Sequence, residues 1–121
     1  MRILVVDDDA LAAEMTVAVL EDGGCDVVAV EDGQRALALL ERDSAFDAVV
    51  SDMNMPGMSG LDLFRTLRGE KGGIPFILLS GDDPLSLRQQ EPRLTACIAK
   101  DMDLETSLMT AVADALLPSA D

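Results

Sequence analysis

Short apolar runs alternate with helix-like patterns along the chain, and this alternation restricts the possible folds more than any other feature. The apolar runs lie at residues 3–6, 26–30, 48–51, 76–79 and 96–99. Continuous apolar runs of this length are typical of strands that are covered on both faces of a parallel sheet. Helical patterns occur at residues 10–20, 33–42 and 61–67, and a last one follows the capping residue Asp103.

Strands and helices that alternate through short loops predict an α/β fold, a doubly wound five-stranded parallel sheet with helices on both faces. In the first helix, Leu11, Met15 and Val19 recur at helical spacing, and Asp9 is placed to cap its start. We expect residues 1–121 to form one domain, because a chain of 121 residues matches the usual size of one.

The composition excludes several classes of function. The chain carries 23 Asp and Glu against 9 Lys and Arg, which gives a net charge of −14 and disfavours binding to nucleic acid or to an anionic membrane. It has no histidine, so catalysis by Ser-His or Cys-His pairs and histidine-ligated metals are excluded. The two cysteines, Cys25 and Cys97, are too few for a disulfide framework and predict free thiols in a cytoplasmic protein.

Polar residues directly follow four of the five predicted strands. They are Asp7, Asp8 and Asp9 after the first strand, Asp52 after the third, Ser80 to Asp83 after the fourth and Lys100 after the fifth. Ligands of open parallel sheets bind beyond the carboxyl ends of the strands, so we expect these groups to converge at one edge. Carboxylates separated by about 4 Å repel one another, and a hard divalent cation such as Mg²⁺ offsets that repulsion.

This set of groups suggests phosphoryl transfer. The Asp52 carboxylate can attack phosphorus and form an acyl phosphate. A metal ion and Lys100 can neutralise the phosphoryl oxygens, and the Ser80 hydroxyl can donate a hydrogen bond to one of them. Taken singly, these residues have ordinary explanations as a solvated loop acid, a solvated charge and a turn residue. Four matching strand ends in sequence order favour the joint interpretation.

On these motifs the sequence resembles the receiver domain of bacterial two-component response regulators, over residues 2–117. The motifs are residues 5–9, 51–60 and 78–81, and Lys100 followed by 103–105. The resemblance implies a flavodoxin-like (βα)5 fold with strand order 2-1-3-4-5. It also implies a phosphoprotein that acts mainly as a signalling module, and that catalyses its own phosphotransfer and autodephosphorylation.

The resemblance assigns roles residue by residue. Asp52 accepts the phosphoryl group from a histidine kinase or a histidine phosphotransfer protein. Asp7 and Asp8 bind Mg²⁺ or Mn²⁺ together with Asp52 and the backbone carbonyl of Asn54. The downstream partner is unknown, and the domain is either free-standing or part of a larger chain such as a hybrid histidine kinase.

Other positions implied by the resemblance act on the phosphoryl group or on the switch. Ser80 and Lys100 contact the phosphoryl oxygens, and the side chains of Asn54 and Asp82 tune the lifetime of the phosphoryl group. Cys97 stands where the family has an aromatic switch residue, so the readout cannot be the flip of a ring.

Two further positions differ from the family. Asp101 replaces the proline that usually follows the lysine, and a cis bond before a non-proline residue costs about 3 kcal/mol. The segment before the fifth strand is a poor fourth helix, since Pro92 limits it to about two turns.

Two alternative functions stay open. A phosphatase of the haloacid dehalogenase type would use Asp7 as its nucleophile, with Ser80 and Lys100 in its later motifs, but it leaves Asp52 unexplained. A receiver-like scaffold that binds partners without being phosphorylated is favoured by the unusual Cys97 and Asp101.

Overall fold

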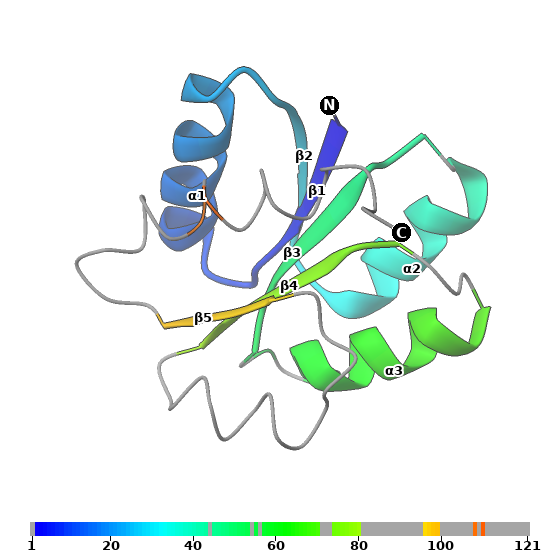
Figure 1. Ribbon diagram of the computed structural model, residues 1–121. Helices are drawn as coiled ribbons and strands as arrows, with labels where there is room; N and C mark the ends of the chain where they lie inside the picture. The colour runs from blue at the N-terminus through cyan, green and yellow to red at the C-terminus, as the bar shows by residue number, and fades with distance from the viewer. Residues whose placement is uncertain are drawn as a thin grey trace.

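The computed structural model describes residues 2–43, 45–53, 55, 57–70, 74–80, 96–99, 108 and 110. Within these residues five parallel strands form one sheet in the order β2-β1-β3-β4-β5 (Figure 1). The strands are β1 (Arg2–Val6), β2 (Asp26–Val30), β3 (Ala48–Asp52), β4 (Phe76–Ser80) and β5 (Ala96–Ala99). The helices are α1 (Ala10–Asp22), α2 (Gly33–Arg42) and α3 (Gly60–Glu70). The predicted sheet, its strand order and these three helices are therefore confirmed.

Some of the predicted elements cannot be compared with the structure. The poor fourth helix before β5 lies outside the described residues, and so does the last predicted helix apart from Leu108 and Thr110. None of the helices in the described part of the chain is long and apolar enough to cross a membrane.

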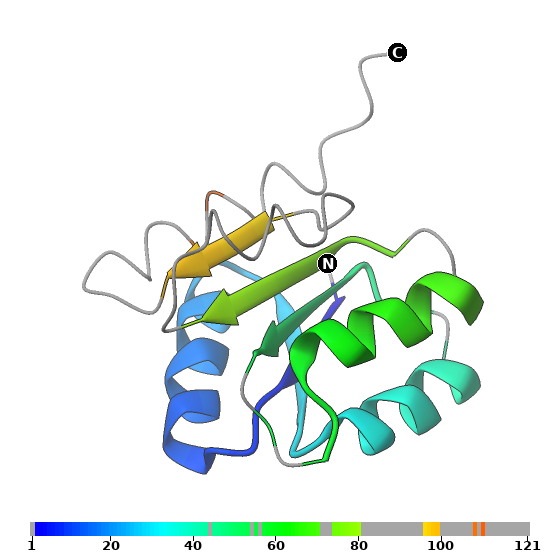
Figure 2. The same cartoon turned by 90° about the horizontal axis from the view of Figure 1, so that it is seen from below.

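Helices cover both faces of the sheet, with α1 on one face and α2 and α3 on the other (Figure 2). Successive side chains of a strand point to opposite faces. In β1, Leu4 and Val6 accordingly belong to the core under α2 and α3, whereas Ile3 and Val5 belong to the core under α1. This double burial explains why the strand sequences are continuous apolar runs.

Helix α1 begins where the sequence predicts, but its buried side differs from the one that the apolar spacing marks. The Asp9 carboxylate caps the helix by accepting hydrogen bonds from the N–H groups of Leu11 and Ala12. Ala13, Thr16 and Leu20 are the residues that α1 buries. Leu11 and Met15 are 67% and 64% exposed. Small or apolar residues occupy nearly every position of α1, so spacing alone identifies the helix without fixing its inner side.

Arg2 joins the start of β1 to the segment before β3. Its backbone N–H and C=O bond the Asp47 carboxylate and N–H at 2.8 and 2.7 Å, and its Nη1 lies 2.5 Å from Oδ2 of Asp43. The guanidinium carbon lies 4.5 Å from the centroid of the Phe46 ring. A hydrogen bond from the Ala45 N–H, supported by Arg2, holds the pKa of Asp43 below its ordinary value of 3.8.

We expect this ion pair to give a measurable pH dependence of stability. A carboxyl whose folded-state pKa is lowered adds stability above its unfolded pKa, and that stability is lost as the pH falls through the folded value. Asp43→Asn should therefore lower the free energy of unfolding at neutral pH, and the difference from wild type should shrink below about pH 4. Chemical unfolding of both proteins at pH 7 and at pH 3 measures this. A difference of equal size at the two pH values, or the same behaviour in the Asp26→Asn control, contradicts it.

Candidate functional site

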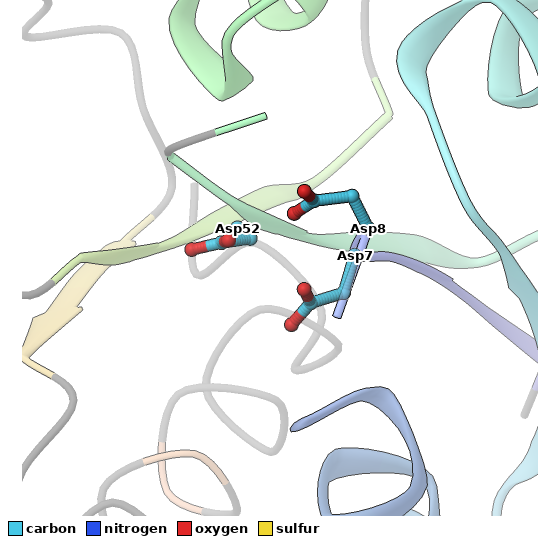
Figure 3. Close-up of side chains that lie close together, drawn as sticks. All are labelled: Asp7, Asp8 and Asp52. Carbon is cyan, nitrogen blue, oxygen red and sulfur yellow. The ribbon is translucent and has the colours of Figure 1, made fainter. Parts of the chain in front are cut away.

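The register between β1 and β3 brings two carboxylates together at the carboxyl edge of the sheet. Val6 is paired with Ser51, so the next residues, Asp7 and Asp52, lie side by side. Asp8 joins them from the start of the β1–α1 loop (Figure 3). One carboxylate oxygen from each of the three residues lies within 4.8 Å of the others. The predicted convergence of Asp7, Asp8 and Asp52 is therefore confirmed.

Two of these three carboxylates are shielded from solvent. Asp7 and Asp52 are 4% and 6% exposed, whereas Asp8 is exposed. Oδ1 of Asp7 accepts a hydrogen bond from the Asp9 N–H at 2.9 Å, and the Asp7 N–H donates to the Val30 carbonyl at 3.1 Å. Burying charged carboxylates is costly unless hydrogen bonds or opposite charge compensate. The site therefore has a strong electrostatic preference for a cation.

Backbone hydrogen bonds hold the chain on both sides of Asp52. The Ser51 hydroxyl donates to the Asp52 carbonyl at 2.9 Å, inside the core. The Met53 N–H donates to the Leu79 carbonyl at 2.8 Å, which extends the ladder between β3 and β4 by one residue. The Met53 carbonyl in turn accepts from the Gly60 N–H at 2.9 Å. Asp52 is therefore fixed both by the sheet and by the start of α3.

A reciprocal capping box starts α3. The Asp62 N–H donates to Oγ of Ser59 at 3.1 Å, and the Ser59 N–H donates to the Asp62 carboxylate at 3.2 Å. This pairing satisfies N–H groups that no helical carbonyl can accept. Gly57, just before it, has a φ of +79°, a conformation that side chains with a Cβ adopt at a cost. The end of the motif at residues 51–60 thus serves to place α3.

Gly60 permits a close approach of α3 to the backbone of Asp52. A Cβ at this position would lie 2.5 Å from the Asp52 carbonyl oxygen and 2.5 Å from Cδ1 of Leu78. Both distances are far below van der Waals contact, and one of the two atoms belongs to the backbone. A residue larger than glycine must therefore push α3 and β3 apart beneath the acidic cluster.

We expect Gly60→Ala to lower the free energy of unfolding by about 1–3 kcal/mol, the usual cost of overpacking. Gly33→Ala is a matched control, because its Cβ would meet only the Met58 side chain, which can move away. Urea unfolding of the two variants against wild type makes the comparison. Equal costs for the two substitutions would show that the contact with the Asp52 backbone is not the reason for a glycine at position 60.

Several predicted site residues cannot be placed. Ser80 ends β4 and is paired with Ala99 in the sheet. The side chains of Ser80 and Cys97, and the residues Asn54, Asp82, Lys100 and Asp101, lie outside what the structure describes. Their assigned roles stay predictions.

The donor set fits a hard divalent cation. Mg²⁺ takes oxygen ligands, usually one or two carboxylates with water or phosphate oxygens in the other positions. Asp7, Asp8 and Asp52 supply converging carboxylate oxygens, and the exposure of Asp8 leaves one side of the cluster facing solvent. The geometry is therefore suited to hold Mg²⁺ or Mn²⁺ next to the Asp52 carboxylate.

A family model described as the response regulator receiver domain matches residues 3–113. The chain belongs to this family. The DNA-binding response regulator MtrA of Mycobacterium tuberculosis is 44% identical over 79 residues, which cover 65% of this chain and 34% of MtrA. This chain therefore spans about a third of the length of that relative. The expected resemblance to response regulators is confirmed, and family membership connects the domain with two-component signalling.

Solved structures confirm the flavodoxin-like fold. The chemotaxis response regulator CheY4 of Vibrio cholerae has 26% sequence identity and a TM-score of 0.84, covering 95% of this chain and 98% of that one. The response regulator TrrA of Thermotoga maritima, in complex with Mg²⁺-BeF, has 28% identity and a TM-score of 0.86 with the same two coverages.

Proposed function

We propose that this receiver domain accepts a phosphoryl group on Asp52 from a histidine of a kinase or a phosphotransfer protein. The observation that carries this proposal is the convergence of Asp7 and Asp8 on the buried Asp52 carboxylate. Mg²⁺ or Mn²⁺ would be held by these three side chains and by the Asn54 carbonyl. The solved TrrA complex, which contains Mg²⁺-BeF, supports the same use of a related domain.

The transfer balances as a displacement at phosphorus. An oxygen of the Asp52 carboxylate forms the new P–O bond while the P–N bond to the donor imidazole breaks. The electron pair of the broken bond stays on that nitrogen, which is then free to take up a proton. The metal ion, when bound, neutralises charge on the phosphoryl oxygens. The Lys100 ammonium and the Ser80 hydroxyl would contact the same oxygens, and Asn54 and Asp82 would control access of water for hydrolysis.

The hydrogen bonding of Asp7 favours Asp52 over Asp7 as the nucleophile. Oδ1 of Asp7 already accepts the Asp9 N–H, and Asp7 lies where it can act as a metal ligand beside Asp52. A phosphatase of the haloacid dehalogenase type would instead use Asp7 and would leave the structured loop after Asp52 without a purpose. We infer that residues 1–121 form one cytoplasmic receiver domain, with an unidentified downstream protein as its partner.

The first test is covalent labelling with a small phosphodonor. We expect wild type, incubated with acetyl phosphate and Mg²⁺, to gain the mass of one phosphoryl group in intact-mass spectrometry. Asp52→Asn should gain none, because an amide does not attack phosphorus as a carboxylate does. Asp22→Asn changes an exposed carboxylate at the end of α1 and should behave as wild type.

The two alternatives give different results in the same experiment. Phosphate that persists in Asp52→Asn and disappears in Asp7→Asn would support the phosphatase mechanism. Wild type that gains no phosphate, from acetyl phosphate or from a phosphorylated histidine donor, would support the binding scaffold.

The second test is stabilisation by the metal. A ligand at about 100 times its Kd stabilises the folded state by about 2.7 kcal/mol, which raises the Tm of a domain of this size by several degrees. We expect Mg²⁺ to raise the Tm of wild type and to raise that of Asp8→Asn less. Asp8→Asn should also melt higher than wild type without metal, because one repulsive charge is gone. Equal Mg²⁺ shifts in wild type and Asp8→Asn would contradict a site built from this cluster.

A further inference from the structure

A groove with a volume of about 480 Å³ lies between α1 and the edge strand β2. Its walls include the apolar side chains of Ala13, Val17 and Val30. One end reaches Asp7, so the groove adjoins the acidic cluster without being part of it. Since β2 has a strand on only one side, the groove opens at the margin of the sheet.

The charges that line this groove are all negative. Glu14, Glu21 and Glu31 line it in addition to Asp7, and the ten lining residues include no lysine or arginine. Arg35 lies 3.3 Å from Glu31, but both side chains are more than 60% exposed, and exposed pairs of this kind contribute little. Glu14 and Glu21 stand seven residues apart on α1, so their charges lie two turns apart along one side of the groove.

Exposed apolar surface continues from the groove over the outside of α1. In the part of the chain that the structure describes, the large hydrophobic residues that are exposed are Leu11 and Met15. Each stands three residues before a groove residue, Leu11 before Glu14 and Met15 before Ala18, and residues at this spacing are neighbours on a helix. Contiguous exposed apolar surface with a charged rim is typical of an interaction site.

We propose that the α1–β2 surface, made of Leu11, Met15, Val17, Glu14 and Glu21, binds a cationic polypeptide segment of another protein. Apolar side chains of the segment pack on Leu11, Met15 and Val17, and its lysines or arginines pair with Glu14 and Glu21. This inference goes beyond the proposed function and does not depend on the phosphorylation of Asp52.

Charge and shape argue against other occupants. A second copy of this chain would bring the same carboxylates face to face, and each copy carries a net charge of −14. Nucleic acids and anionic membranes are repelled for the same reason. A small molecule would fill the groove but would leave Leu11 and Met15 in water. A polypeptide segment covers both parts of the surface.

The experiment uses two synthetic helical peptides of equal length, one of leucine and lysine and one of leucine and glutamate. Each is titrated into ¹⁵N-labelled protein without divalent cations and at physiological ionic strength. We expect the lysine peptide to bind saturably and to shift the amide signals of Ala13, Val17 and Val30. The glutamate peptide should not bind.

Two matched variants separate local contact from long-range attraction. Glu14→Lys and Glu41→Lys make the same change of charge at exposed helical positions, in the groove and on α2 respectively. We expect Glu14→Lys to raise the Kd of the lysine peptide about five- to tenfold, and Glu41→Lys to change it less than about twofold. Met15→Gln should also weaken binding, whereas Met15→Leu should preserve it.

The possible failures of this experiment are specific. Equal effects of Glu14→Lys and Glu41→Lys, or signal changes spread over the whole surface, would show non-specific attraction to an acidic protein and overturn the proposal. A concentration-dependent dimer with Met15 at its interface would overturn it in favour of a second copy. Asp52→Asn should bind the peptide as wild type does, so a failure of phosphorylation leaves this result unchanged.

Discussion

Repulsion among three neighbouring carboxylates is the constraint around which this domain is arranged. The pairing of Val6 with Ser51 places Asp7 and Asp52 side by side, and both are almost fully buried. Such an arrangement opposes folding, so the sheet has to supply the compensating stability. It does so through apolar strands packed on both faces and through hydrogen bonds that hold Asp7 in place. A fold that keeps acids together in this way is prepared for a cation before one binds.

The residues around the cluster divide into those that carry charge and those that hold the charge in position. Asp7, Asp8 and Asp52 supply the carboxylates. Gly60 does no chemistry, yet only a residue without a Cβ lets α3 start against the Asp52 carbonyl. The pairing of Ser59 with Asp62 likewise fixes the first turn of α3. The specificity of the motif after β3 is therefore as much a matter of packing as of phosphate chemistry.

The sequence predicted the strands and the acidic cluster well because both follow from simple rules. Doubly buried strands are continuous apolar runs, and the carboxyl ends of parallel strands meet at one edge, so Asp7 and Asp52 could be placed together. The inner side of α1 could not be derived, because small and apolar residues surround this helix and Leu11 and Met15 give a misleading stripe. The spacing of Ser59 and Asp62 carried a readable capping signal, whereas the contact that requires Gly60 exists only in three dimensions.

The same negative charge has two different physical meanings in this molecule. In the cluster, carboxylates that are mostly buried lie within 4.8 Å of one another, a spacing suited to a single compact ion with several units of coordination. Along α1, exposed carboxylates stand two helical turns apart beside apolar side chains, a spacing that no single ion can bridge. Such a surface is complementary to a segment whose positive charges are equally spread out. Because Asp7 borders both regions, a positive charge bound at the end of the groove would oppose a metal ion at the cluster, and the two binding events would be thermodynamically linked.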